Sequence, residues 1–224
     1  MSTPTYNGTR SALHAVAESL LAGPQHRRSG TIRLAVTDDG FSTLRMDGDV
    51  RRIAVEGADL VVDTTAGRRR TPLAGTLGSL AGQVGLDLGA PQGVYTVVNR
   101  QDPANGISVD PDDVVTVLGA LARGDAALRR AGALEVGESA PAPVLWPEHF
   151  DVGVAIDGVN LGVSPGDGHI AEPYAYVGPP SPRHGEFWNQ PFGAARPLSE
   201  MPELESLVDW FALGLAAARH DPPA

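Results

Sequence analysis

The sequence predicts a single α+β domain over residues 1–224, in which a mainly antiparallel sheet of hairpins and meanders is covered by three or four helices. Two observations support this class. Runs of alternating apolar and polar residues come in pairs joined by short turns, as in antiparallel hairpins. Other segments, including those near both ends, place apolar residues at helical spacing. At 224 residues the chain can bury one large core, and a polar stretch at 135–143 is the one internal boundary that the sequence suggests.

The first half of the chain opens with a helix predicted over about 9–22. Its apolar positions recur every three or four residues, as on a helix with one buried face, and they are Leu13, Val16, Ala17, Leu20 and Leu21. We expect Gly23 and Pro24 to end this helix. His14 on this helix and His220 on the last helix are expected at the surface.

The rest of this half combines predicted strands with one further helix. The strands carry alternating side chains, and the last two form a hairpin around the turn at 56–59. These elements are strands over 31–36, 51–55 and 60–63, a helix over 76–84 and a segment over 92–107 that is irregular or a short strand. Three consecutive arginines, Arg68 to Arg70, follow Gly67 in a predicted turn. A solvated loop is the simple expectation there, and an anion contact is the alternative.

The second half begins with the best helix start in the chain. Asp110 can cap the helix, Pro111 fits its first position, and the two carboxylates that follow face the positive end of the helix dipole. We expect Gly132 to end it. Its buried face consists of Val114, Val117, Leu118, Leu121 and Leu128.

A hairpin around Asp157-Gly158 is the clearest strand signal, because this dipeptide suits a two-residue turn. Its strands over 151–156 and 159–164 place one set of side chains on a single buried face, and these are Val152, Val154, Ile156, Val159, Leu161 and Val163. The opposite face is nearly bare backbone, which lets a helix, aromatic rings or a ligand approach. A third strand over 170–177 and a last helix over 202–219 complete this part.

The composition excludes several classes of partner and chemistry. The net charge is −10, and nucleic acids and anionic membranes are bound through positive surfaces, so neither is an expected partner. The chain has no Cys, which excludes disulfides, thiol catalysis and thiolate metal sites. There is no apolar stretch long enough to cross a membrane and no signal-peptide core, so we expect a cytoplasmic protein.

Aromatic and His side chains are concentrated in residues 145–192. Large rings supply contact area at low entropic cost, and imidazoles supply proton-transfer groups, so we expect the functional site in this region. The candidate ligand-binding residues are Trp146, Asn160, Tyr174, Tyr176, Trp188 and Asn189. His149 and His169 are the candidate catalytic residues. The alternative is that these rings form a core with no ligand.

An antiparallel meander would gather polar residues at one edge of the sheet. These residues are Glu148, His149, Asp151, Ser164, Asp167, His169 and Glu172. Imidazole and carboxylate groups can hold a divalent metal without thiols, and His149, His169 and Glu172 are the candidate ligands. A metal-free, hydrogen-bonded cluster is the favoured alternative, and the sequence indicates no other cofactor.

One apparent catalytic motif is rejected on physical grounds. The run from Gly162 to Gly166 matches the G-x-S-x-G pattern of serine hydrolases around Ser164. In those enzymes the residue after the serine donates its backbone N–H to the oxyanion. Here that residue is Pro165, which has no N–H to donate.

Two segments carry a resemblance to other proteins, Val144-Leu145-Trp146-Pro147-Glu148-His149-Phe150-Asp151 and Glu172-Pro173-Tyr174-Ala175-Tyr176-Val177-Gly178-Pro179. Through them the chain resembles a group of uncharacterised actinobacterial proteins of about this length, which also look similar at 13–18, 55–62, 85–91 and 187–194. It is more distantly similar to a larger bacterial domain-of-unknown-function family, in the strand at 30–35, in Trp146, Phe150 and Asp151, and in a Tyr-x-Tyr strand followed by prolines. The resemblance implies a single fold and brings no activity with it.

Three hypotheses for function follow. The leading one is a small-molecule-binding protein with an aromatic and His-lined site in 145–192, for which enzymatic activity is left open. The alternative is a non-enzymatic interaction or self-association module, in which the aromatic patch or the last helix binds a partner or a second copy. The third is a metal-dependent enzyme that uses His149 and His169.

Overall fold

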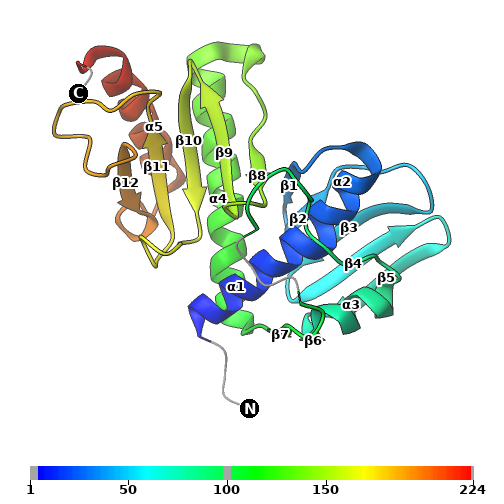
Figure 1. Ribbon diagram of the computed structural model, residues 1–224. Coiled ribbons are helices and arrows are strands. Elements are labelled where there is room, and N and C mark those ends of the chain that lie inside the picture. Colours follow the sequence, from blue (N-terminus) through cyan, green and yellow to red (C-terminus); the bar gives the residue numbers. More distant parts are fainter. Residues whose placement is uncertain (1–4, 98–101, 223–224) are drawn as a thin grey trace. The chain divides into compact units, whose positions relative to one another are not determined.

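The computed structural model describes residues 5–97 and 102–222, and the chain divides into two compact units. Unit 1 comprises Met1–Gly119 and Leu145–Phe150, and unit 2 comprises Ala120–Val144 and Asp151–Ala224. Each unit holds antiparallel strands with helices packed against them (Figure 1), so the predicted α+β class with mainly antiparallel sheet is confirmed. Within the described ranges, no helix has the length and apolar character needed to cross a membrane.

The sheet of unit 1 has the strand order β8-β1-β2-β3-β4-β5, and its paired strands are antiparallel. The strands are β1 (Leu34–Thr37), β2 (Gly40–Thr43), β3 (Val50–Glu56), β4 (Asp59–Thr64), β5 (Gly67–Pro72) and β8 (Val144–Trp146). The predicted hairpin is confirmed as β3 and β4. The strand predicted from residue 31 begins only at Leu34. The Gln25 side-chain amide donates hydrogen bonds to the carbonyls of Thr31 and Arg33, at 3.1 and 2.8 Å, so these carbonyls do not pair with a neighbouring strand.

The first helix does not end at Gly23 and Pro24 as predicted. It runs through α1 (Tyr6–Val16), the π-helix η1 (Ala17–Ala22) and α2 (Gly23–Ser29). In the π-helical turn, Gly23 N–H donates to the Glu18 carbonyl five residues back. The next π-helical donor would be Pro24, which has no N–H, so the Ser19 carbonyl instead accepts from Gly89 N at 3.1 Å. The π-turn thus accommodates Pro24 within a continuous helical segment.

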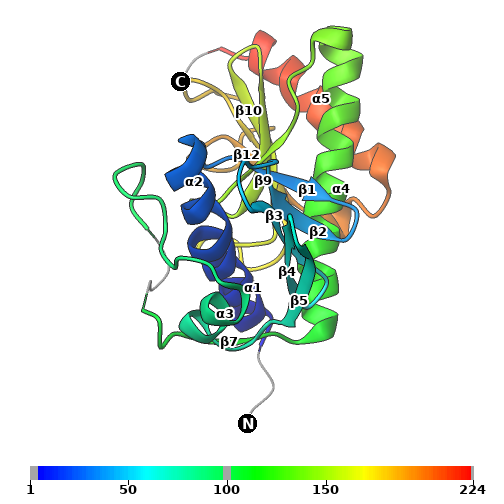
Figure 2. The same cartoon turned by 90° about the vertical axis from the view of Figure 1, so that its right-hand side faces the viewer.

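The core of unit 1 lies between this helical segment and the sheet. All five predicted apolar positions of the first helix are buried. Helix α3 (Leu77–Val84) begins at Thr76, which forms a capping box with Ser79, and it lies on the same side of the sheet as α1 (Figure 2). A small sheet of β6 (Ala74–Thr76) and β7 (Gly106–Ser108) lies beside these helices. Of the segment predicted as irregular, residues 98–101 lie outside the described residues.

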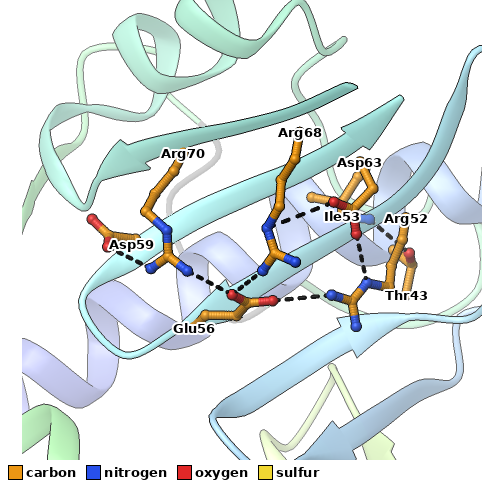
Figure 3. Close-up of polar contacts among 8 residues, drawn as sticks. All are labelled: Thr43, Arg52, Ile53, Glu56, Asp59, Asp63, Arg68 and Arg70. Carbon is orange, nitrogen blue, oxygen red and sulfur yellow. Dashed lines mark hydrogen bonds and ion pairs between the residues drawn. The ribbon is translucent and has the colours of Figure 1, made fainter. Parts of the chain in front are cut away.

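The three arginines after Gly67 lie in strand β5 and not in the predicted loop. Arg68 and Arg70 turn toward Glu56, which also pairs with Arg52 at 3.0 Å (Figure 3). Arg70 lies 2.8 Å from Glu56 and 2.8 Å from Asp59. The anions that these arginines contact are therefore carboxylates of the same unit, and the network ties β3, β4 and β5 together.

Helix α4 (Pro111–Val136) begins as predicted, because the Asp110 carboxylate accepts from the N–H groups of Asp112 and Asp113. It passes Gly132, the predicted end, and stops before Gly137, whose φ is 65°. At Gly132 a Cβ would lie 3.1 Å from the Ala140 side chain, so this glycine serves close packing. Within unit 2, Gly124 of α4 packs on the side chains of Val152 and Val163.

The sheet of unit 2 has the order β9-β10-β11-β12, again antiparallel, and its register is the predicted one. Ile156 pairs with Val159 around the Asp157-Gly158 turn, and all six predicted core side chains are buried. The strands are β9 (Asp151–Ile156), β10 (Val159–Ser164), β11 (Tyr174–Gly178) and β12 (Ala194–Pro197). Helices α4 and α5 (Leu204–His220) cover the apolar face (Figure 1).

Strand β11 begins four residues later than predicted. Asp167 folds the preceding segment into a turn, since its carboxylate accepts from the N–H groups of His169 and Ile170 at 2.7 and 2.8 Å. Short 3₁₀ turns, η2 (Gly137–Ser139) and η3 (Leu198–Glu200), precede β8 and α5.

Candidate functional site

A group of polar side chains gathers around helix α1 and η1 of unit 1, and we call it the polar cluster. It consists of Arg10, His14, Glu18, Tyr95 and Glu148. The first three are four residues apart on one helical segment, so they follow one face. The other two come from the segments before residue 98 and after β8, so the fold assembles the cluster from three distant parts of the sequence.

His14 is largely buried, with 13% of its side chain exposed, which corrects the expectation of a surface residue. Its Nε2 lies 2.7 Å from the Pro147 carbonyl, and a carbonyl only accepts, so Nε2 carries the proton. The pKa of His14 is lowered from 6.5 to about 4. Burial is the largest cause, the hydrogen bond to Pro147 opposes it, and the charges of Arg10 and His149 contribute to the lowering. At neutral pH the imidazole is uncharged, and its Nδ1 is an acceptor.

Glu18 is a carboxylate inside the protein, because its side chain is fully buried in the π-helix η1. One carboxylate oxygen lies 3.9 Å from His14 Nε2. π-Helical turns are uncommon and occur frequently at functional sites. Burying a carboxylate is costly. The position of Glu18 in this turn therefore makes the cluster the strongest candidate site in the described part of unit 1.

Tyr95 lies beside Glu18 and completes the far side of the cluster. Burial raises the pKa of the Tyr95 hydroxyl above its ordinary value of 10.0, and the negative charges of Glu18 and Glu148 raise it further. The hydroxyl therefore remains a hydrogen-bond donor at neutral pH. The preceding segment is fixed to the helices, since Arg27 donates to the carbonyls of Asp87 and Gly89 at 2.5 and 3.1 Å.

The short segment after β8 closes over His14. The Phe150 ring stacks on the His14 ring, with centroids 5.2 Å apart and planes 11° apart. Phe150 has a φ of 53°, a conformation that a bulky side chain rarely adopts and that costs on the order of 1–3 kcal/mol. Its ring also meets Phe41 edge-on at 5.5 Å. Packing on both sides thus holds a strained residue in place beside the cluster.

Two charged atoms of the cluster are buried without a hydrogen-bond partner among the described residues. They are Nη1 of Arg10 and Oε2 of Glu148. Elsewhere in unit 1 a buried polar group is fully used: the Gln25 amide donates to two carbonyls and accepts from Leu44 N at 2.6 Å. Buried polar atoms are nearly always hydrogen-bonded, so each such exception requires an explanation.

The ring-rich region 145–192 is divided between the two units. Its first residues, Leu145–Phe150, belong to unit 1 and supply Glu148 and Phe150 next to His14. Trp146 stacks under the Arg33 guanidinium, 5.7 Å from the ring centroid, and His149 is exposed at the edge of the polar cluster. The remaining candidates lie in unit 2.

In unit 2 the predicted polar edge is a set of tyrosine–carboxylate hydrogen bonds. The Tyr176 hydroxyl donates to Asp151 at 2.5 Å, and the Tyr174 hydroxyl donates to Asp167 at 2.6 Å. Burial, followed by the Asp151 charge, raises the pKa of Tyr176 well above 10.0. The Tyr176 ring lies on Gly162, where a Cβ would be 2.3 Å from the ring, so an aromatic ring covers the predicted bare face.

Two other candidates hold the fold of unit 2 together. Trp188 Nε1 donates to Asp221 at 2.9 Å, which ties the loop before β12 to the end of α5. The Asn189 amide donates to the Ala195 carbonyl at 3.0 Å and accepts from the Ala195 N–H at 2.9 Å, as a backbone partner would. Asn160 is exposed on β10.

The predicted metal ligands are divided between the two units. His149 belongs to unit 1, whereas His169 and Glu172 are exposed residues of unit 2. Among residues 5–97 and 102–222, no group of three or more His, Asp and Glu side chains is arranged to hold a metal ion.

Sequence reasoning missed Arg10, Glu18 and Tyr95. A signal for Glu18 was present, because residues 12–22 are apolar on every face except at His14, Glu18 and Ser19. A helix that is apolar all round is buried, so its charged residue must lie inside the protein. Tyr95 carries no such signal, since only the tertiary fold brings it to the helix.

Compared with known protein families, with curated proteins and with solved structures, the chain matches none of them. The resemblance to uncharacterised actinobacterial proteins therefore stays a prediction, and the argument for function depends on the geometry of the site.

Proposed function

We propose that the protein binds a small molecule at the polar cluster of unit 1. The observation that carries this proposal is the pair of buried charged atoms, Arg10 Nη1 and Glu148 Oε2, that find no hydrogen-bond partner among the described residues. Each unsatisfied buried group costs about 1–3 kcal/mol, and more for a charged group. A ligand that supplies an acceptor to Arg10 and a donor to Glu148 removes that cost when it binds.

Three features of the surroundings support binding over a purely structural role. Arg10, Tyr95 and Glu148 are half-buried, so the cluster reaches the surface of unit 1. The neutral His14 ring is fixed by Pro147 and Phe150, and a fixed ring is preorganised to accept a hydrogen bond. Strain at Phe150 is also typical of ligand sites. The proposal keeps the predicted small-molecule function and locates its site at the 145–150 end of the ring-rich region.

The first test compares the stability of the free protein with its ligand binding. Replacing Glu148 with Gln removes an uncompensated charge, so we expect Glu148→Gln to raise the melting temperature of the ligand-free protein. We expect native mass spectrometry of the purified wild-type protein to show a bound small molecule as a discrete mass shift, and Glu148→Gln should abolish that shift. Glu186→Gln, at an exposed position of unit 2, is the matched control and should change neither reading.

A structural role for Glu148 gives the opposite result. In that case Glu148→Gln lowers the melting temperature, and the wild-type protein shows only its denatured mass in native spectra. If a library of small metabolites then produces no thermal stabilisation of the wild-type protein, the proposal is wrong.

A further inference from the structure

We infer that the ligand of the polar cluster is a zwitterionic small molecule, with its carboxylate at Arg10 and its ammonium group at Glu148. This inference rests on the proposed function and adds the chemical class of the ligand. It starts from the signs of the two buried atoms that lack a partner among the described residues. One is a cationic donor, Arg10 Nη1, and the other is an anionic acceptor, Glu148 Oε2.

These two opposite charges lie in one cluster and do not pair with each other. No ion pair between them is present in the described residues, although such a pair would satisfy both atoms without any ligand. Arg10 lies on helix α1 and Glu148 follows strand β8, so the two charges come from different parts of the fold. Arg10 acts on the pKa of His14, and Glu148 acts on that of Tyr95. The neutral His14 ring and the protonated Tyr95 hydroxyl belong to the same cluster.

A ligand with a single charge fits this arrangement poorly. An anion would satisfy Arg10 but would leave Glu148 Oε2 without a donor. A cation would satisfy Glu148 and leave Arg10 buried without its acceptor. A molecule with both charges removes both costs, and its uncharged middle would meet the His14 and Tyr95 groups, which are themselves uncharged.

A series of ω-amino acids of increasing length measures the separation of the two charged atoms. The series consists of glycine, β-alanine, 4-aminobutanoate, 5-aminopentanoate and 6-aminohexanoate, and glycylglycine tests a peptide as the source of the same two charges.

The experiment is isothermal titration calorimetry of the full chain with this series, together with the N-acetyl and carboxamide derivative of each compound. We expect affinity to peak at one chain length and to require both charges. A hydrogen bond to a charged group is worth about 1.5–3 kcal/mol, so removing either charge of the ligand should weaken binding about 10- to 100-fold.

Two variants assign each charge to its end of the site. Arg10→Gln should weaken binding of the best zwitterion about tenfold or more and leave its carboxamide derivative unaffected. Glu148→Gln should weaken binding of the same zwitterion and leave its N-acetyl derivative unaffected. Arg45→Gln, at an exposed position of unit 1, controls for the loss of one positive charge. Circular dichroism of each variant confirms that it is folded.

The possible results separate this inference from the proposed function. If a singly charged derivative binds as tightly as its parent, or if neither variant weakens the zwitterion, the zwitterionic ligand is ruled out. The proposed function then still stands if other small molecules stabilise the protein and lose affinity in Glu148→Gln. If no compound of the series binds, the inference is wrong, and a clean native mass with no stabilising metabolite removes the function as well.

Discussion

Both units place buried tyrosines beside carboxylates, but the hydrogen bonds that these groups make differ between the units. In unit 2, Tyr176 donates to Asp151 and Tyr174 donates to Asp167, in short hydrogen bonds of 2.5 and 2.6 Å. In unit 1, Tyr95 lies between Glu18 and Glu148, and Glu148 Oε2 has no hydrogen-bond partner among the described residues. A satisfied network rigidifies a fold, whereas an incomplete one is costly unless something else completes it. The two tyrosine–carboxylate bonds of unit 2 fit a structural role, and the unpartnered Glu148 oxygen supports the binding role that we propose for the cluster of unit 1.

The largest expected effect comes from the glycine that closes the π-turn in unit 1. A Cβ on Gly23 would lie 1.6 Å from the Gly89 carbonyl oxygen, a backbone atom held in place by Arg27. We expect Gly23→Ala to lower the free energy of unfolding by about 3 kcal/mol or more, because overpacking here must displace the chain. Chemical denaturation measures this loss.

In unit 2, a Cβ on Gly124 would lie 2.6 and 2.8 Å from valine side chains. We expect Gly124→Ala to lower the free energy of unfolding by about 2 kcal/mol, because these side chains can shift.

The helical control for both substitutions is Gly82→Ala in α3. No atom lies within 4 Å of a Cβ at this position, so alanine should stabilise by about 0.5–1 kcal/mol through helix propensity alone. An equal effect of alanine at Gly23 and Gly82 would show that the contact with Gly89 does not constrain the π-turn.

The pH dependence of stability should differ between the two units. His14 binds a proton near pH 6.5 in the unfolded chain and only near pH 4 in the folded one. The unfolded state therefore holds more protons between these values, and the free energy of unfolding falls by about 3 kcal/mol as the pH falls from 6.5 to 4. Above pH 6.5 this contribution is complete and constant.

Denaturation of His14→Gln across the same range isolates this contribution, because the variant lacks the titrating ring. Identical slopes for wild type and variant would contradict it.

Asp167 of unit 2 affects stability in a lower pH range: burial raises its pKa, but hydrogen bonds from Tyr174, Ile170 and His169 lower it below 3.8. Its stabilising effect is therefore present above pH 3.8 and is lost only as the pH falls through the lower value in the folded state.

The contribution of each tyrosine hydroxyl of unit 2 to the free energy of unfolding should increase with the burial of its carboxylate partner. Tyr176→Phe removes a donor to the buried Asp151, and we expect a loss of about 2 kcal/mol. Tyr174→Phe should lose only about 1 kcal/mol, since Asp167 is more exposed and keeps two backbone donors. Thermal denaturation of both variants checks the order. If the Tyr174 variant loses more, the structural ranking of the two pairs is wrong.

The smallest effect is expected at the arginine network of unit 1. Arg68 is half exposed, at 49% of its side chain, so water and salt screen its pairs with Glu56 and Asp63. Arg68→Gln should cost less than about 1 kcal/mol at low salt and nothing measurable at high salt. Denaturation at two salt concentrations tests this, and a salt-independent loss would show that the network acts through packing instead.

Local patterns predicted unit 2 better than unit 1. The hairpin around Asp157-Gly158 has the predicted register because its turn and its alternating side chains are both local in the sequence. The same reasoning failed at His14, which was expected at the surface. Its burial depends on Pro147 and Phe150, which lie more than 130 positions along the chain.

The π-helix η1 was also beyond prediction, for a physical reason. Gly23 and Pro24 predict the end of an α-helix, because in an α-helix each N–H donates to the carbonyl four residues back and proline has no N–H. The helix continues because the π-turn pairs each N–H with the carbonyl five residues back. The Ser19 carbonyl, which Pro24 cannot serve, accepts from the N–H of Gly89 in a distant segment. Helical periodicity places Arg10, His14 and Glu18 on one face, but Tyr95 and Glu148 come from distant segments, so the full cluster could not be assembled from periodicity alone.

The arginines of strand β5 have a consequence for how molecules of this protein meet one another. β5 is the last strand in the order of its sheet, and such an edge can accept a strand from another molecule. Because Arg68 and Arg70 project from one face and Arg69 from the other, a second copy adding to this edge would bring arginines against arginines on both faces. Carboxylates within the unit neutralise one of these faces, while the row of guanidinium groups remains along the edge. The charge that ties β3, β4 and β5 together therefore also opposes the addition of a second copy at this edge.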